Sequence, residues 1–295
     1  MAADECLPMI AAIPSPPWNS ISLGPFRLHL YGLMLALGVL AAYKIAEIRY
    51  AKQGRDPADI GRISVVVVVS GVIGARVYHL FTGYKWHQDG LLNSLAIWKG
   101  GLSIWGAVAG GVIGLVFMAR RLHLDTFAVL DACGPAVVVA QAIGRWGNYF
   151  NQELFGKPTS LPWGLEIDPA HRPANYLTVR TFQPTFLYES LWCLLVFGAI
   201  VWAERRFRFR KGQAFALYVA MYTFGRVFFE WMRVDPASRI FGIRFNLLLS
   251  AVLCVAFSAW FVILGRRPES ELAIAPSLAP PEAESESERA ADGQV

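Results

Sequence analysis

The sequence predicts an all-α polytopic membrane protein with about seven transmembrane helices and a small cap domain on its outer side. Only 17% of the 295 residues are charged and 55% are hydrophobic, whereas soluble domains carry about a quarter charged residues. The mean hydropathy is +0.40. Ten Trp, ten Tyr and nineteen Phe also suit aromatic belts at two membrane interfaces.

A spanning helix needs about 20 mostly apolar residues, and seven stretches of the chain come close to that length. They are residues 26–46, 63–81, 102–119, 127–143, 184–202, 213–231 and 245–264. The third, fourth and sixth are rich in Gly, Ala or polar residues. We therefore expect those three inside the bundle, where small residues let helices approach closely.

Composition divides the chain into three parts. Residues 1–25 are an outer N-terminal segment, 26–265 the seven-span domain, and 266–295 an acidic cytoplasmic tail whose Pro, Ala, Ser and Glu content predicts disorder. The seven-span domain includes two long outer loops, 82–101 and 144–183, and loops of that length are usually functional. Residues 1–20 are not expected to be a cleaved signal, because Asp4 and Glu5 replace its basic region.

Lys and Arg concentrate in alternate connections, and in multi-span proteins such connections are cytoplasmic. The residues are Arg49, Lys52, Arg55 and Arg62, then Arg120 and Arg121, then Arg205, Arg206, Arg208, Arg210 and Lys211, and finally Arg266 and Arg267. We therefore expect the N-terminus outside and the C-terminus inside. The net charge of +5 is spread over these connections and not over one face, which argues against nucleic-acid binding.

The cysteines predict neither a metal site nor a disulfide framework, because no Cys/His spacing typical of either occurs. Cys133, Cys193 and Cys254 lie in apolar runs, where a cysteine packs as a small hydrophobe. We expect no metal and no cofactor.

Several charged residues of the predicted spans fall at one depth, just below the outer surface. They are Arg76, Arg145, Glu189 and Arg226, with Tyr31 and Trp105 near the same level and Glu230 and Arg233 just above. An arginine at mid-span costs about 2.5–3.5 kcal/mol unless it is paired. The local charge is positive, so an anion is expected there, most simply a phospholipid headgroup.

A structural ion-pair network is the alternative explanation of these charges. It is favoured for Arg76 with Glu189, whereas a ligand site is favoured for Arg145 with Arg226. Arg145 alone could also be a boundary residue that extends its charged end into water.

Residues 144–156 carry the most specific pattern, Gly144-Arg145-x-Gly147-Asn148-x-x-Asn151-x-Glu153-x-x-Gly156. This pattern resembles the signature of the prolipoprotein diacylglyceryl transferase family. Four further motifs also resemble that family: they begin at His29, Gly100, Gln183 and Tyr222. The resemblance extends from about residue 21 to residue 265.

The resemblance implies a multi-pass enzyme of the bacterial cytoplasmic membrane. Such enzymes transfer the diacylglyceryl group of phosphatidylglycerol to the lipobox cysteine of a prolipoprotein signal peptide, forming a thioether and releasing glycerol phosphate. It implies that Arg145 and Arg226 are essential and that Tyr31, Asn148, Glu153 and Gly156 belong to the site. We assign catalysis to Arg145, Arg226 and Glu153. The substrate-binding set is Tyr31, Arg76, Trp105, Asn148, Asn151, Gly156, Tyr222 and Glu230. We expect a monomer.

One departure from the family pattern concerns the base that takes the thiol proton. Trp105 and Gln183 stand where histidines are usual, and an indole N–H is only a donor. The base is therefore unassigned; the arginine field alone, Glu153 or another group remain open. A transporter or flippase for an anionic lipid is the alternative function. It is less favoured because the halves show no repeat and the site is shallow, not at the midplane.

Overall fold

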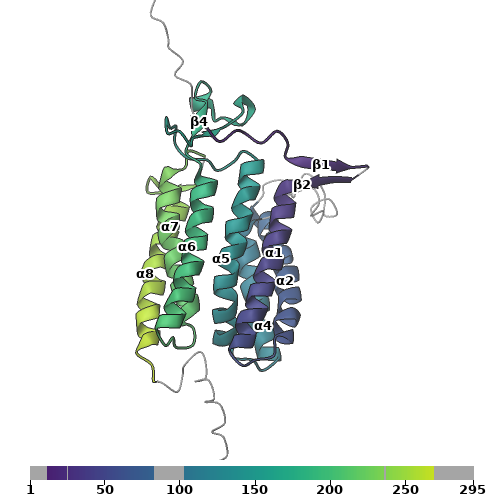
Figure 1. Cartoon of the computed structure of the whole chain (residues 1–295), viewed down its shortest axis with the longest axis vertical. Coiled ribbons are helices and arrows are strands. Elements are labelled where there is room, and N and C mark those ends of the chain that lie inside the picture. Colours follow the sequence, from purple (N-terminus) through teal and green to yellow (C-terminus); the bar gives the residue numbers. More distant parts are fainter. Residues whose placement is uncertain (1–11, 25, 83–102, 236, 269–295) are drawn as a thin grey trace, which may run out of the picture.

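The computed structural model describes residues 12–268 apart from residues 25, 83–102 and 236. The described part contains seven α-helices packed side by side along one direction (Figure 1). They are α1 (Leu30–Lys52), α2 (Ala58–Thr82), α4 (Ile104–Arg121), α5 (Thr126–Phe150), α6 (Thr185–Arg206), α7 (Gln213–Met232) and α8 (Phe245–Gly265). Each of the seven predicted runs coincides with one helix. The predicted outer loop 82–101 lies almost wholly outside the described residues, as do most of the N-terminal segment and the tail from residue 269.

Among the described helices, six combine the length and the apolar composition that a membrane crossing needs, and α7 is the exception. α5 is the centre of the bundle: half of its apolar stretch is buried inside the chain, and it packs against α1, α6 and α7. α7 carries Arg226 and Glu230 in its last two turns, and it lies against α5, α6 and α8. The architecture is therefore that of a polytopic membrane protein.

The pair α2 and α4 is held at backbone contact by glycine. A Cβ added at Gly106 or Gly110 of α4 would collide with a carbonyl oxygen of α2, that of Gly74 or Ser70. Small residues one turn apart permit such close packing in membranes. The expectation that this span lies inside the bundle is wrong, because the opposite face of α4 is exposed, including Ile113. Its glycines serve one neighbour and do not mark a central position.

The end of the bundle opposite the cap is tied together by polar groups that are buried or partly buried. Asp131 of α5 accepts hydrogen bonds from the backbone N–H groups of Gly212 (2.6 Å) and Phe215 (2.9 Å) and thereby caps α7. Arg49 of α1 forms a two-pronged ion pair with Glu204 of α6 at 2.9 and 2.7 Å. The Asp131 contacts fix α7, and with it Arg226, relative to α5, and the Arg49 pair joins α6 to α1.

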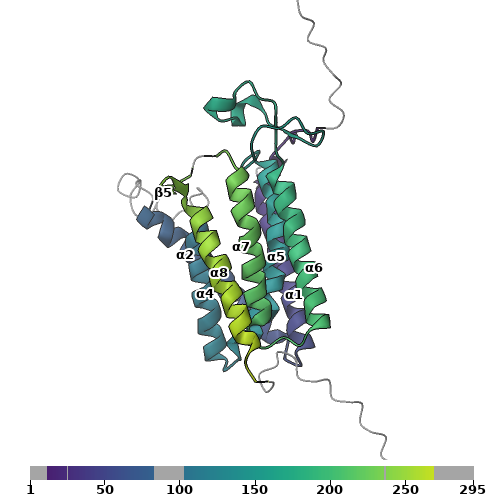
Figure 2. The ribbon, with the colours of Figure 1, turned by 90° about the vertical axis from the view of Figure 1, so that its left-hand side faces the viewer.

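Strands occur only in the connections, so the all-α prediction holds for the bundle alone. The described residues form three two-stranded antiparallel sheets: β1 (Ser20–Leu23) with β2 (Phe26–His29), β3 (Leu165–Glu166) with β4 (Thr181–Phe182), and β5 (Arg239–Ile240) with β6 (Ile243–Arg244). Because residues 26–29 pair with residues 20–23, the first helix begins at Leu30 and not at Phe26. Figure 2 shows the β3–β4 region standing above one end of the bundle.

The segment between α5 and α6 folds around a small apolar core of its own. Phe155, Leu165, Ile167, Phe182 and Phe186 are buried together, and two short 3₁₀ helices, η2 (Pro169–His171) and η3 (Ala174–Tyr176), complete it. We call residues 151–184 the cap segment. The predicted loop boundary at residue 144 differs from the structure, because α5 continues to Phe150.

Candidate active site

Two arginines from different helices meet at one buried carboxylate. Arg145 of α5 and Arg226 of α7 lie 2.8 and 2.7 Å from the same oxygen, Oε2 of Glu189 on α6. Arg145 is five residues from the end of α5 and Arg226 six from the end of α7. At 1.5 Å per residue both therefore lie about 8–9 Å below the helix ends. The expected meeting of charges at one depth is confirmed for these residues.

A second carboxylate extends the network toward the cap end. Glu230, whose side chain is fully buried, accepts from Arg226 at 2.7 Å, from Arg233 at 3.3 Å and from Arg244 at 2.9 Å. Arg233 and Arg244 also bind Asp235, at 2.7 and 3.2 Å. Arg244 precedes α8 directly, so the network joins four consecutive helices of the second half, α5 to α8.

The connected network carries an excess of positive charge. Four guanidinium groups, those of Arg145, Arg226, Arg233 and Arg244, are joined to three carboxylates, those of Glu189, Glu230 and Asp235. Each guanidinium has five N–H donors, and the contacts above use only some of them. The side chains of Arg145 and Arg226 keep 16% and 14% of their surface exposed. The ion-paired network, taken without the neighbouring Glu153, therefore retains donors and one net positive charge for an anion.

Beside this network, Glu153 is held by two amides. Its Oε1 accepts from Asn148 Nδ2 at 2.9 Å and from Asn151 Nδ2 at 3.5 Å. Asn148 also lies 3.5 Å from Arg145 through its Oδ1. Glu153 is exposed and orients the two asparagines. Among the described contacts it forms no ion pair with an arginine.

Tyr31 enters this group from the first turn of α1. Its hydroxyl interacts electrostatically with two charged groups, Glu153 and Arg145. Its ring lies against Gly147, where an added Cβ would come within 2.6 Å of a ring carbon. Gly147 lies within α5, and its missing side chain permits this close approach of the Tyr31 ring.

Glu153 is set between two residues with left-handed backbones, Gln152 at φ 51° and Leu154 at φ 58°. A non-glycine residue pays about 1–2 kcal/mol for that conformation. Gln152 and Asp168 hold the turn reciprocally: Gln152 Nε2 donates to Asp168 Oδ2 at 2.6 Å and its Oε1 accepts from the Asp168 N–H at 2.8 Å. Thr185 Oγ1 donates to the carbonyl of Leu154.

Asp168 is charged under ordinary conditions. The hydrogen bonds from Gln152 and Ser15 lower the pKa of its carboxyl below the usual value. The cap segment therefore anchors the Glu153 turn through an ionised group.

Gly156 and Tyr222 lie next to the same group. Gly156 pairs with Arg233 in an isolated β-bridge, and an added Cβ would meet the Gln183 side chain at 2.7 Å. Tyr222 places its hydroxyl 3.4 Å from Arg145 Nη2.

Trp105 and Arg76 lie on α4 and α2, and not on the helices that carry the ion-pair network. Trp105 packs edge-on against Phe245 of α8, with ring centroids 6.0 Å apart. Arg76 is buried on α2, whose main neighbour is α4. The ion pairs of Glu189 run to Arg145 and Arg226.

The sequence did not single out several residues that build the site. Arg244, Asp235, Gln152 and Asp168 belong to connections whose fold no periodicity predicts. Glu189 was expected to pair with Arg76. Its position about one turn into α6 was the feature of the sequence that indicated the same depth as Arg145.

The comparison of the whole chain with known families decides the relationship. The sequence profile of a family described as "Prolipoprotein diacylglyceryl transferase" matches residues 19–264. The chain belongs to the prolipoprotein diacylglyceryl transferase family. The matched range contains the cap segment and the seven described helices except the last residue of α8, so every residue of the network above falls inside it.

Individual relatives agree with the family. A phosphatidylglycerol–prolipoprotein diacylglyceryl transferase of Frankia alni is 46% identical over 263 residues, 88% of this chain and 69% of that protein. Transferase 2 of Streptomyces coelicolor is 45% identical over 259 residues, 85% of this chain and 82% of that protein. The transferase of Cutibacterium acnes is 41% identical over 264 residues, 87% and 88% of the two chains.

Proposed function

We propose that this chain transfers the diacylglyceryl group of phosphatidylglycerol to the lipobox cysteine of a prolipoprotein signal peptide. In this reaction the cysteine sulfur forms a bond to a glyceryl carbon of the lipid. The bond from that carbon to a phosphate oxygen breaks, glycerol phosphate leaves with the electron pair, and the thiol proton goes to a base. The observation that carries the proposal is the convergence of Arg145 and Arg226 on one carboxylate, that of Glu189, which brings two guanidinium groups within reach of a single anion.

The two guanidinium groups suit the charge change of this reaction. Negative charge grows on the phosphate as the carbon–oxygen bond breaks, and preset donors in a dry site stabilise such charge. Arginine presents a planar fork that fits phosphate oxygens. Removing a single donor of this kind typically costs about 10²–10³ in rate. Arg145 and Arg226 bind the phosphate, and Glu189 holds them together beforehand.

The groups around Glu153 complete the proposed site. Asn148 and Asn151 bind headgroup hydroxyls or ester oxygens, and Tyr31 donates to a phosphate or ester oxygen. Glu153 is the proposed proton acceptor, because two amides fix the position of its carboxylate through Oε1 and no ion pair with a described residue neutralises it. Arg76, Trp105, Tyr222, Gly156 and Glu230 are assigned to the binding site from the sequence.

We further propose that all seven helices, α7 included, cross the bacterial cytoplasmic membrane, with the cap segment and the N-terminus outside and the C-terminus inside. The basic residues of the α1–α2, α4–α5 and α6–α7 connections support this orientation. The enzyme works as a monomer in this proposal. Labelling of single cysteines placed at Trp163 and at Arg208 with a membrane-impermeant maleimide tests the orientation: only the first should react in intact cells.

The activity test mixes purified protein, labelled phosphatidylglycerol and a lipobox peptide. A thioether product that carries the diacylglyceryl label is expected. Movement of the lipid between leaflets without product would instead support a flippase. The relatives are named as transferases, which favours the first outcome.

A further inference from the structure

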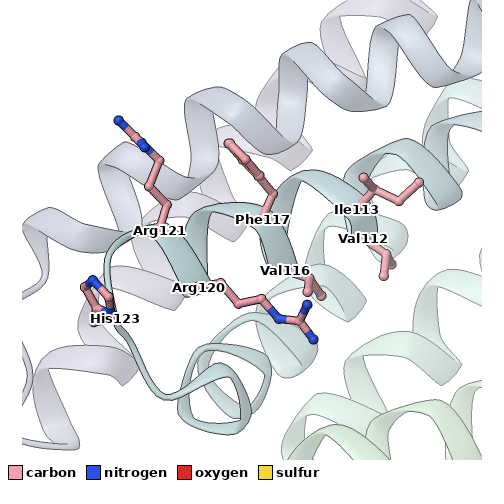
Figure 3. Close-up of a pocket in the computed structure, with 7 residues that line it drawn as sticks. All are labelled: Val112, Ile113, Val116, Phe117, Arg120, Arg121 and His123. Atoms are coloured by element: carbon pink, nitrogen blue, oxygen red, sulfur yellow. The ribbon is translucent and has the colours of Figure 1, made fainter.

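A groove lies on the exposed side of α4, at the end opposite the cap segment. Its volume is about 730 Å³, and it is open rather than enclosed, because every described residue that lines it belongs to α4 or to the turn that follows. Its wall is apolar and made by residues one turn apart, Val112, Ile113, Val116 and Phe117. Figure 3 shows these side chains along two neighbouring rows of the helix.

The end of the groove is basic. Arg120 and Arg121 continue the two rows (Figure 3), and His123 closes the end. His123 has φ 54°, and the bonds from His123 N–H to Arg120 C=O (3.1 Å) and from Leu124 N–H to Ala119 C=O (2.8 Å) form a Schellman turn. This turn brings the imidazole back beside the arginines.

The two arginines have no acidic partner within the described chain. Both are exposed, and no ion pair or hydrogen bond joins either of them to another residue. The carboxylate nearest in sequence, Asp125, is already paired with Arg55 and Lys211. Two charges at the mouth of an apolar groove thus remain available to an external anion.

The occupant that fits both halves is an anionic phospholipid. Acyl chains pack on Val112, Ile113, Val116 and Phe117, and a phosphate binds guanidinium groups through paired N–H donors. The distance along α4 from Trp105 to Arg120 is fifteen residues, or about 22 Å. The groove therefore opens on the leaflet opposite the one that holds Arg145 and Arg226, whichever way the protein faces.

We propose that this groove, the α4 groove, is a binding site for an anionic phospholipid of the second leaflet, separate from the transfer site. The acyl chain lies along Val116 and Phe117, and the phosphate lies at the arginine end of the groove. Recognition depends on the phosphate charge together with the groove, and not on the substrate's glycerol headgroup.

A photo-crosslinking experiment tests this proposal in the full chain. Phe117→p-benzoylphenylalanine keeps the phenyl ring and adds a group that captures adjacent lipid on irradiation. The matched control is Trp202→p-benzoylphenylalanine: Trp202 is also exposed and also precedes an arginine pair, Arg205 and Arg206, by three and four residues in the last turn of a helix. The protein is placed in vesicles of equal parts phosphatidylglycerol and phosphatidylcholine with identical chains, and adducts are identified by mass.

The expected result is an enrichment of phosphatidylglycerol over phosphatidylcholine at position 117 of about fivefold or more, since one basic residue near an anionic surface already supplies that order of preference. Position 202 should stay near the vesicle ratio. Equal enrichment at the two positions would mean that any arginine pair suffices, and would overturn the proposal. A ratio of one at position 117 would also overturn it.

Two further experiments test whether capture depends on the arginine charges and on the lipid headgroup, and whether it is separate from the transfer reaction. Arg120→Gln with Arg121→Gln should abolish the enrichment at position 117, whereas Arg205→Gln with Arg206→Gln should leave it unchanged. The first pair of changes should also leave the transfer rate unaltered. Phosphatidylserine in place of phosphatidylglycerol should be captured equally well; its rejection would show headgroup recognition and overturn the charge-based proposal.

Discussion

Arg145 and Arg226 bind the same oxygen atom, Oε2 of Glu189, from two different helices. The two guanidinium groups repel each other, and the shared carboxylate compensates for this repulsion within the bundle. An anionic oxygen thus already lies between the two guanidinium groups, and the phosphate is proposed to bind the N–H donors that Glu189 leaves free. Glu189 is the residue on which the spacing of the arginines depends.

Glu189→Ala should therefore destabilise the protein by about 3–5 kcal/mol, because it leaves buried charges without their partner. Unfolding in detergent measures this change. Glu166→Ala is the control: Glu166 pairs with Arg180 at 3.1 Å at the surface, where such a pair contributes about 0–1 kcal/mol. Equal effects of the two substitutions would contradict the role given to Glu189.

Arg226→Ala should lower the transfer rate by about 10²–10³ or more, because it removes donors aimed at the leaving phosphate. Arg62→Ala is the control, since Arg62 is exposed at the other end of the bundle and pairs with Asp59 at 3.1 Å. Because Arg145 and Arg226 are proposed to act as a unit on one phosphate, the double variant should be little worse than either single variant. Near-normal turnover in Arg226→Ala would remove the basis of the proposed site.

Gly110→Ala should destabilise the bundle by about 1–3 kcal/mol, the usual cost of overpacking, since the new methyl group meets the Ser70 carbonyl. Gly198→Ala on α6 has open space around the added Cβ and should be neutral or gain about 0.5–1 kcal/mol from helix propensity. Thermal unfolding of both variants in one detergent gives the comparison. A stable Gly110→Ala protein would show that α2 and α4 separate at little cost.

The cap segment should loosen in acid because of Asp168. Its pKa in the folded protein lies below the usual value of 3.8, so its contribution to stability is complete above that value. The contribution is lost as the pH falls through the lowered pKa. Protection of the Glu166 and Ile167 amides from hydrogen exchange should thus fall below about pH 4 and stay constant between pH 5 and 8.

The variant Asp168→Asn isolates this effect. Its cap protection should be reduced at neutral pH, and the acid-dependent part of the loss should disappear. Asp59→Asn, at the other end of the bundle in an exposed pair with Arg62, should behave like the unmodified protein. An unchanged acid profile in Asp168→Asn would assign the loosening to another group.

Trp105→His should retain activity, because Trp105 contacts Phe245 through its ring edge and is assigned only to the shape of the pocket. The rate with a lipobox peptide measures this. If the new imidazole served as a base, the rate would rise between about pH 6 and 8, where histidine titrates. Complete loss of activity would show that the indole packs directly on a substrate.

The sequence predicted the helices of the bundle well because each is a long apolar run. The length of such a run is enough to identify a helix that can span a membrane. It also predicted that Arg145 and Arg226 lie at one depth, since residue counts from helix ends measure depth. It failed at the boundaries near residues 26 and 144, where strand pairing and a continued helix replaced the expected start and loop. It failed for α4 because glycine content does not say which face a neighbour covers.

The site was only partly predictable for a related reason. Arg145, Asn148 and Glu153 lie within one short motif, so their proximity followed from local spacing. The reciprocal contact of Gln152 with Asp168 and the position of Arg244 depend on how the connections fold, and no pattern of hydrophobic residues encodes that.

Arg244 has three attachments at once: it closes the β5–β6 hairpin, precedes α8, and binds the carboxylate that also holds Arg226. An antibody or a crosslink that displaces this hairpin from outside therefore also displaces the proposed reaction centre, through the side chain of Arg244. Screens that score only turnover will register damage to the hairpin as damage to catalysis.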